Sequence, residues 1–409
     1  MYENKTEVNK VLILGVHTQE WDDFQFDNLI NEMKSLVDTA GGLVKGQVQQ
    51  KLSRLDSRTA IGKGKLEEVK AIIDDLDIDL VVFLNKLRPI VQRNLEEALG
   101  VAVIDRVQLI LDIFALRAKS HEGKLQVELA QNQYLLPRLM GQGQALSRLG
   151  GGIGTRGPGE TKLETDRRHL RDRINKIKND LKEMELHRER TREQRRKGKE
   201  FNIGLVGYTN AGKSTILSKL TESQTYIQDQ LFATLDPLTR TFEINKHDNF
   251  TITDTVGFIE ELPTELIHAF KSTLEEIQDV DLLLHVVDSS HPARLMHEAT
   301  VNQLLLDLEM QEIPILVVYN KSDMLQKEFQ ASLFPFVLIS AKKDADIDRL
   351  KESIWQTCLE MSEPYTKRIP IAETYLLHQY QSQTFVDKVV YNEESQEYIV
   401  TGFQRNDYY

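Results

Sequence analysis

A short run of glycines, a lysine and a hydroxyl residue carries the clearest chemical signal in this sequence. Residues 207–214 read GYTNAGKS and fit G-x-x-x-x-G-K-[ST], between an apolar run at Phe201–Val206 and a helix-like run from Lys213. In this pattern, backbone N–H groups surround phosphate oxygens, the lysine reaches the β- and γ-phosphates, and the hydroxyl binds Mg²⁺. We therefore predict a phosphate-binding loop in which Lys213 is catalytic and Ser214 is a metal ligand. The predicted nucleotide-binding residues are Gly207, Tyr208, Thr209, Asn210, Ala211, Gly212, Lys213, Ser214 and Thr215.

A second motif, D-x-x-G, ends the strand-like run Phe250–Asp254. An aspartate at this point can hold Mg²⁺ through water, and the N–H of the glycine can approach the γ-phosphate without a clashing side chain. The pattern is common at strand ends, but it becomes informative when it follows a phosphate-binding loop. We predict nucleotide contacts from Asp254, Thr255, Val256 and Gly257, with Asp254 at the metal and Gly257 in catalysis.

Two further motifs predict which base is bound. The sequence NKSD follows the strand-like run Ile315–Tyr319, and its Asp323 carboxylate can accept from guanine N1–H and the 2-amino group, which adenine lacks. Because an unpaired buried carboxylate costs about 1–3 kcal/mol or more, adenine nucleotides should be rejected. Asn320 would connect this loop to the phosphate-binding loop, and the Lys321 stem would lie against the base. The second motif, SAK at 340–342, stands at the end of the next strand-like run, and its Ala341 N–H could contact guanine O6. The predicted base-site residues are Asn320, Lys321, Asp323, Ser340, Ala341 and Lys342.

The elements that must position these motifs alternate between strands and helices. Strand-like runs lie near 201–206, 250–254, 282–288, 315–320 and 336–340, and helix-like runs near 213–220, 264–277, 297–309 and 347–361. Such alternation predicts a doubly wound α/β domain, here 200–363, with the motifs at the carboxyl ends of its strands. Residues 11–104 show a similar alternation, which predicts a separate α/β domain over 1–106. Residues 364–409 suggest a small α+β domain with the order β-α-β-β.

Between these domains, the sequence predicts a long antiparallel helical hairpin over 107–199. The first helix should run from Val107 to Leu136, with a break near Gly123 and an end near Pro137. In the second helix, apolar residues step by four and three along an a/d seam, which is typical of a helix packed lengthwise on another. The tip, at about 140–160, holds 8 of the 22 glycines within 141–159. The seam residues are Leu170, Ile174, Ile177, Leu181 and Met184.

Composition narrows the class of protein further. The formal charge is −12, but residues 160–200 carry +5 and the remainder −17, so one basic arm could bind RNA. The single cysteine, Cys358, excludes an internal disulfide, and no apolar stretch is long enough to span a membrane. Residues 1–10 lack the pattern of a secretion signal. We expect a cytoplasmic protein that acts as a monomer.

The ordered motifs resemble the P-loop GTPases of the translation-factor-related class. By this resemblance, Phe232, Ala233 and Thr234 lie in switch I, contact the nucleotide, and include a catalytic Mg²⁺ ligand, Thr234. Phe258 lies where Ras-like enzymes place a water-orienting glutamine, so we expect slow hydrolysis that a partner or cation stimulates. Asn210 lies at the position that helps bind K⁺ in potassium-activated relatives. The alternative is that Asn210 serves loop packing or a backbone bond.

The segments DR at 105–106, GKLQVELAQNQYLLPRL, LSRLGGGIGTRGPGETKLETDRRHLRDRI and SRTAIGKGK resemble the HflX family of ribosome-associated GTPases. The resemblance implies a factor that binds the large ribosomal subunit, with the hairpin loop near the peptidyl transferase centre, and splits stalled or idle ribosomes under stress. Glycines permit close backbone approach to RNA, and arginines contact phosphates and stack on bases. The rRNA contacts expected from the hairpin are Arg138, Arg148, Arg156, Arg167 and Arg168.

Three other functions stay open at this point. The protein could be a GTPase that serves ribosome assembly, a potassium-dependent GTPase of tRNA modification, or an RNA-binding scaffold in which the nucleotide stabilises the fold. No cofactor motif for modification is present, whereas Phe258 keeps the scaffold alternative open. Residues 62–65, GKGK, are too short for a second phosphate-binding loop and favour a β-turn that leads into a helix.

Overall fold

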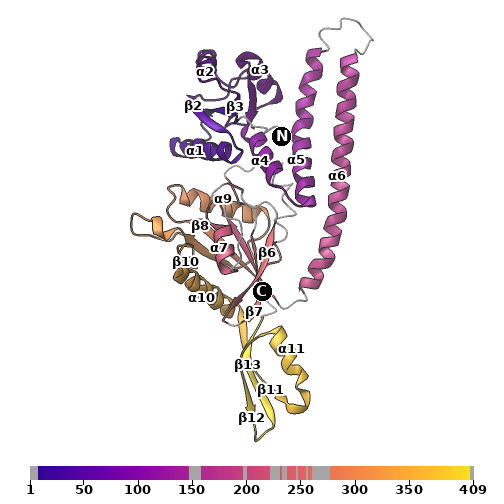
Figure 1. Cartoon of the computed structure of the whole chain (residues 1–409), viewed down its shortest axis with the longest axis vertical. Coiled ribbons are helices and arrows are strands. Elements are labelled where there is room, and N and C mark those ends of the chain that lie inside the picture. Colours follow the sequence, from indigo (N-terminus) through magenta and orange to yellow (C-terminus); the bar gives the residue numbers. More distant parts are fainter. Residues whose placement is uncertain are drawn as a thin grey trace, which may run out of the picture. The chain divides into compact units, whose positions relative to one another are not determined.

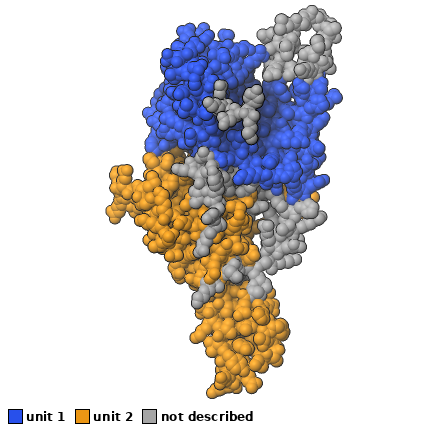
Figure 2. Space-filling view, viewed as in Figure 1, with its two compact units in different colours: residues 1–184, 229–236, 260–271 blue, residues 185–228, 237–259, 272–409 orange. Residues whose placement is uncertain are grey.

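The computed structural model describes residues 8–146, 158–196, 200–221, 231–232, 237–245, 247–254, 257–259 and 277–405. The chain forms two compact units, coloured separately in Figure 2. The first comprises 1–184, 229–236 and 260–271, and the second comprises 185–228, 237–259 and 272–409.

The amino-terminal part of the first unit is a four-stranded parallel sheet with the order β2-β1-β3-β4. Parallel neighbours need crossover helices, and the predicted alternation of strands and helices is confirmed. Strand β1 is buried from Val11 to His17, as expected for a strand covered on both faces. The elements are β1 (Lys10–His17), α1 (Asp23–Thr39), β2 (Leu43–Lys51), α2 (Lys63–Leu76), β3 (Leu80–Phe83), α3 (Pro89–Leu99) and β4 (Ala102–Asp105).

Three helices follow: α4 (Arg106–Arg117), α5 (His121–Leu146) and α6 (Pro158–Arg196), and α5 and α6 form the long hairpin seen in Figure 1. The break after α4 lies at 118–120 and not at Gly123, because Ser120 Oγ accepts from the Gly123 N–H at 2.8 Å and so caps α5. The expected end near Pro137 is also wrong, since α5 continues through Pro137. The tip loop, 147–157, lies outside the described residues.

The predicted a/d seam of α6 is confirmed by its burial. Ile174 and Ile177 are buried, whereas the neighbouring Arg168 is exposed. An exposed Arg173 guanidinium pairs with both carboxylate oxygens of Glu128 on α5, at 2.5 and 2.6 Å. The two helices of the hairpin are therefore held together by an apolar seam and by polar contacts along its edge.

The second unit contains a six-stranded sheet with the order β10-β9-β8-β5-β7-β6. All neighbours are parallel except β6, which runs antiparallel to β7 at the edge. Strand β6 was not predicted, because only Phe242 and Ile244 are buried in it and no apolar run marks it. The strands are β5 (Phe201–Gly207), β6 (Leu238–Ile244), β7 (His247–Asp254), β8 (Leu282–Asp288), β9 (Ile315–Asn320) and β10 (Phe336–Leu338).

Strand β5 lies between β7 and β8, so the strand order reverses at its carboxyl end. In a doubly wound sheet, ligands bind at such a reversal. The phosphate-binding loop begins there, at Gly207, and leads into α7 (Lys213–Leu220). The other described helices of this sheet are α9 (Arg294–Asp307) and α10 (Asp344–Glu360), with a short 3₁₀ turn at Ser322–Met324.

A three-stranded antiparallel sheet with the order β11-β13-β12 ends the chain. The elements of this region are β11 (Ser362–Pro370), α11 (Tyr375–Gln383), β12 (Phe385–Asn392) and β13 (Glu397–Arg405). Their order agrees with the predicted β-α-β-β order. Strand β11 begins two residues before the predicted boundary at 364. Phe385 stacks on Phe250 of β7 with ring centroids 5.4 Å apart, so the small sheet shares the core of the nucleotide domain.

None of the helices in the described part of the chain combines the length and the apolar composition needed to cross a membrane.

Candidate nucleotide-binding site

Two glycines of the phosphate-binding loop adopt backbone angles that other residues rarely do. Gly207 has φ 149° and Gly212 has φ 101°. A Cβ atom at Gly207 would lie 2.2 Å from the carbonyl oxygen of Val286, and one at Gly212 would lie 2.2 Å from Asn320 Nδ2. Both the conformation and the close approach therefore require glycine, which explains the sequence pattern.

The ammonium of Lys213 is held inside this loop. Its Nζ donates to the carbonyl oxygens of Gly207 and Tyr208, both at 2.9 Å, and the residue is buried. Burial lowers the pKa of Lys213 to about 8, and the Asp254 carboxylate opposes this shift. The loop thus presents one cation at the amino end of α7, where phosphate oxygens bind.

The predicted metal ligands that the structure describes lie together. Ser214 Oγ, in the first turn of α7, donates to Asp254 Oδ2 at the end of β7 at 2.6 Å, and Asp254 is fully buried. A hydroxyl and a carboxylate are oxygen ligands, which Mg²⁺ prefers, and phosphates complete its shell in nucleotide sites. No group of three or more His, Cys, Asp or Glu residues elsewhere among the described residues could hold a metal ion.

Asn320 connects the base-binding loop to the phosphate-binding loop. Its Nδ2 donates to the Ala211 carbonyl and its Oδ1 accepts from the Ala341 N–H, both at 2.9 Å. The predicted connection by Asn320 is thereby present. The Ala341 N–H, however, is bonded within the protein, which differs from the predicted contact with guanine O6.

Asp323 is held in an ionised state beside Ser340 and Lys342. Ser340 Oγ donates to Asp323 Oδ1 at 2.7 Å, and Lys342 Nζ lies 3.4 Å from Oδ2. The Ser340 hydrogen bond is the main cause of a lowered pKa of Asp323. A carboxylate fixed from one side keeps its remaining lone pairs for two donors on one edge of a base, and guanine has two such donors.

Sequence reasoning missed the partner of Lys321. Lys321 Nζ pairs with Asp288 Oδ2 at the end of β8 at 2.7 Å, and both side chains are largely buried. Asp288 in turn accepts from the Ser290 N–H and hydroxyl. The position of Asp288 could have been predicted, since Asp288 ends a buried strand at the same sheet edge as Asn320. Nothing in the sequence, however, indicates which lysine pairs with Asp288.

The segment after D-x-x-G is paired with the phosphate-binding loop through its backbone. The Thr209 N–H donates to the Phe258 carbonyl at 2.7 Å, and the Phe258 N–H donates to the Gly207 carbonyl at 3.2 Å. The Phe258 ring is only 1% exposed and packs in the interior. Phe258 therefore serves as a core residue and as a backbone partner of the phosphate-binding loop.

Phe232 is the described part of the predicted switch I contacts. It has φ 56° and is buried, and its ring meets Phe114 of α4 edge-on, with centroids 4.6 Å apart in the first unit. Six predicted site residues lie outside the described residues: Ala233, Thr234, Thr255, Val256, Arg148 and Arg156.

Asn210 and Tyr208 have local structural roles. Asn210 adopts φ 59°, a left-handed conformation that asparagine tolerates better than most residues, and its side chain is exposed. The Tyr208 ring stacks on His297 of α9 with centroids 3.7 Å apart. The left-handed backbone conformation therefore accounts for an asparagine at position 210 without a bound cation.

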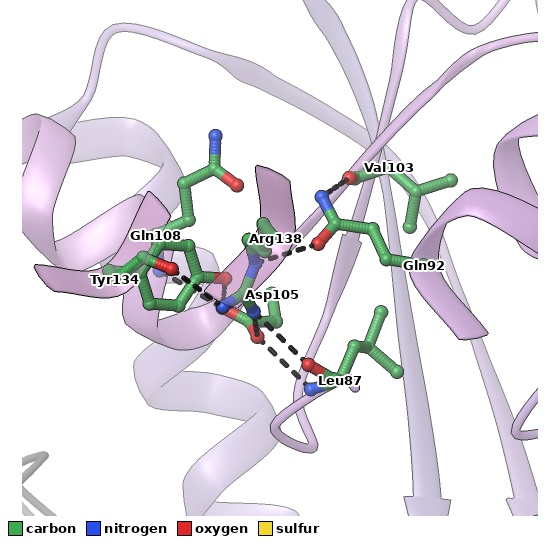
Figure 3. A network of polar contacts seen from close by, with 7 residues as sticks. All are labelled: Leu87, Gln92, Val103, Asp105, Gln108, Tyr134 and Arg138. Atoms are coloured by element: carbon green, nitrogen blue, oxygen red, sulfur yellow. Dashed lines mark hydrogen bonds and ion pairs between the residues drawn. The ribbon is translucent and has the colours of Figure 1, made fainter. Parts of the chain in front are cut away.

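The structure gives Arg138 an internal role that differs from the predicted contact with rRNA. Its side chain pairs with buried Asp105 at 3.0 Å, donates to the Leu87 carbonyl and to Gln92, and covers the Tyr134 ring, with its guanidinium carbon 3.3 Å from the ring centroid (Figure 3). These contacts engage the guanidinium inside the first unit. On α6, Arg168 is exposed and Arg167 is partly buried.

A phosphate-binding loop at a strand-order reversal, with the D-x-x-G, N-K-x-D and S-A-K motifs at neighbouring strand ends, defines a P-loop GTPase. Residues 202–321 match the family described as "50S ribosome-binding GTPase". Residues 27–115 and 117–195 match the families described as "GTP-binding GTPase N-terminal" and "GTP-binding GTPase Middle Region". The chain belongs to the HflX family of GTPases, and it hydrolyses GTP.

Relatives show how far the likeness extends. The GTPase HflX of Alkalihalophilus pseudofirmus is 47% identical over 397 residues, covering 97% of this chain and 94% of that protein. The GTPase HflX of Escherichia coli K12 is 40% identical over 380 residues, covering 91% and 89%. Among solved structures, the SsGBP and GDP complex has a TM-score of 0.50 at 27% identity and covers 85% of this chain and 98% of that one.

Proposed function

We propose that this GTPase binds the large ribosomal subunit in its GTP form and splits stalled or idle ribosomes. The observation that carries the proposal is the hairpin of α5 and α6, whose first helix is attached to the amino-terminal sheet through Asp105 and Arg138. A firmly attached arm can deliver its tip to a defined place on a large partner. The family description of residues 202–321 as a 50S ribosome-binding GTPase supports the same partner.

The rRNA contacts we propose lie on the hairpin. The basic segment 160–200 carries +5 in a chain of −12, which favours phosphate binding by that helix. We assign contacts to Arg167 and Arg168 of α6 and to Arg148 and Arg156 of the tip. Since these contacts are electrostatic, the affinity for large subunits should fall steeply as salt is raised.

In the proposed cycle, Ser214, Thr234 and, through water, Asp254 would hold Mg²⁺, which would supply positive charge beside the β- and γ-phosphates. The γ-phosphate would hold Thr234 and Gly257 in place. Hydrolysis releases these segments, and the affinity for the ribosome falls. The coupling is reciprocal, so large subunits should also raise the affinity for GTP.

The Asn210 side chain could bind K⁺ at this site. The alternative is that asparagine stands at this position because of its left-handed backbone conformation. Turnover measured in K⁺ and in Na⁺ at equal ionic strength separates the two. A higher rate in K⁺ that is lost in Asn210→Ala supports the ion, and equal rates reject it.

Sedimentation tests the ribosome proposal. Assembled ribosomes are mixed with the protein and either a non-hydrolysable GTP analogue or GDP, and the particles are separated on a sucrose gradient. We expect assembled particles to decrease and free subunits to increase with the analogue only. Co-migration with intact large subunits but without dissociation would reject splitting and favour an assembly role.

A further inference from the structure

The GTPase site lacks a water-orienting side chain at the position where Ras-like enzymes have one. Phe258 occupies that position, its ring is buried in the core, and its backbone is paired with the phosphate-binding loop. Hydrolysis nevertheless needs a water held in line with the γ-phosphate. A polar side chain at another position beside that phosphate can provide this contact.

Thr209 lies at the required place. A Cβ atom built on Gly257 would be 2.8 Å from Thr209 Cγ2 and 3.0 Å from Lys213 Nζ. The Thr209 side chain, the Gly257 backbone and the Lys213 ammonium therefore converge on one point. Because Lys213 reaches the β- and γ-phosphates and the Gly257 N–H reaches the γ-phosphate, Thr209 adjoins the γ-phosphate position.

The hydroxyl of Thr209 makes no hydrogen bond within the part of the chain that the structure describes. Thr209 is 7% exposed, and its Oγ1 is enclosed without a hydrogen-bond partner among the described residues. Buried hydroxyls nearly always have a partner, and leaving one unsatisfied costs about 1–3 kcal/mol. A hydroxyl kept in this position at a cost to stability indicates a partner that arrives with the substrate.

The neighbouring side chains of the phosphate-binding loop, in contrast to Thr209, have partners within the protein. Lys213 and Ser214 bond to protein oxygens, and the Tyr208 ring stacks on His297. Thr209 therefore places beside the γ-phosphate position a hydroxyl that has no hydrogen-bond partner among the described residues.

We propose that Thr209 is a catalytic residue whose hydroxyl accepts a hydrogen bond from the attacking water and donates one to a γ-phosphate oxygen. The water oxygen forms a bond to the γ-phosphorus while the bond from phosphorus to the β,γ-bridging oxygen breaks. GDP leaves with the bridging oxygen, and the water proton passes to the γ-phosphate. Thr209 holds the water in line and is unchanged at the end.

Two substitutions separate this role from packing. Thr209→Val keeps the shape and the methyl group but removes the hydroxyl, and Thr209→Ser keeps the hydroxyl but removes the methyl group. Thr221→Val is the matched control, because Thr221 Oγ1 donates to the Leu217 carbonyl at the end of α7, away from the phosphates. GTP hydrolysis is measured in single turnover with excess protein, alongside the affinity for GDP.

We expect Thr209→Val to hydrolyse GTP at least about tenfold more slowly, with GDP affinity within about twofold of the parent protein. Thr209→Ser should stay within about threefold of the parent rate, and Thr221→Val should match it. An unchanged rate in Thr209→Val would overturn the proposal. So would an equally slow Thr209→Ser, which would assign the effect to the methyl group, or a loss of GDP binding in Thr209→Val, which would make Thr209 a binding residue.

Discussion

Arg138 and Asp105 form a 3.0 Å ion pair in which the carboxylate is completely buried and the guanidinium is 14% exposed. All the bonding capacity of Asp105 is used: Oδ2 also accepts from the Leu87 N–H, and Oδ1 accepts from the Gln108 N–H and the Tyr134 hydroxyl. Asp105 thus ends β4, caps α4 and anchors α5 at once (Figure 3). A single carboxylate connects the amino-terminal sheet to the hairpin.

Arg138→Ala should destabilise the first unit by about 3–5 kcal/mol, because it leaves Asp105 buried without its counter-ion. Chemical denaturation followed by far-UV circular dichroism measures this change. Arg173→Ala is the matched control, since Arg173 and Glu128 are 42% and 38% exposed and such pairs contribute about 0–1 kcal/mol. Equal losses in the two variants would show that the buried pair has no special role.

Lys213→Ala should lose at least about 100-fold in GTP turnover, because the cation that meets the β- and γ-phosphates is gone. Its unfolding free energy should not fall, since the buried ammonium is costly to the fold, as its lowered pKa indicates. Lys219→Ala, at the exposed end of the same helix, should keep both properties. Normal turnover in Lys213→Ala would disprove the phosphate-binding role of this loop.

Asp323→Asn should weaken GDP binding about 100-fold or more, because an amide cannot accept from both donors of guanine and two charge-assisted hydrogen bonds are lost. Xanthine carries an oxygen at the position of the 2-amino group, so the variant should gain affinity for xanthosine diphosphate. Competition against a fluorescent guanine nucleotide measures both changes. An Asp323→Asn protein with unchanged preference for GDP would remove Asp323 from the base site, while the exposed Lys343→Ala should behave like the parent.

His297 should make the second unit sensitive to acid. Burial and the neighbouring His291 lower its pKa to about 3, while Asp288 opposes the shift. Below about pH 6.5, His297 is protonated in the unfolded chain but stays neutral in the folded protein. The free energy of unfolding therefore falls as the pH falls. His297→Phe keeps a ring against Tyr208 but removes the titrating imidazole. Between pH 7 and pH 5, the free energy of unfolding should therefore decrease by about 2 kcal/mol less in this variant than in the parent protein.

Urea unfolding at pH 7 and at pH 5 measures this difference. Both proteins should be compared at pH 8 as well, where His297 is neutral in the folded and unfolded states. His285, buried on β8 with a pKa lowered to about 4 by burial and by Lys213, adds a similar acid sensitivity that the variant retains. An identical loss in the parent and in His297→Phe would contradict the buried neutral state of His297.

Local patterns were enough to predict the elements that carry the site. The apolar run from Leu282 to Val287 is β8, and the alternation in 11–104 corresponds to the parallel sheet β2-β1-β3-β4. Strand β6 was missed, and the break that lies at 118–120 was predicted near Gly123, for different reasons. The strand is an exposed edge that an apolar pattern does not mark, and the break depends on the Ser120 cap competing with continued helix.

The nucleotide motifs were readable from the sequence because their chemistry is local: within 207–214 the glycine positions, the lysine and the hydroxyl determine where phosphate oxygens can bind. The roles of side chains that meet partners far along the chain were decided by the tertiary structure alone. Lys321 pairs with Asp288 at the end of β8, and Arg138 reaches Asp105 across 33 residues. A guanidinium on a basic hairpin has the same chemistry whether it faces RNA or a buried carboxylate, and only the fold places Asp105 beside it.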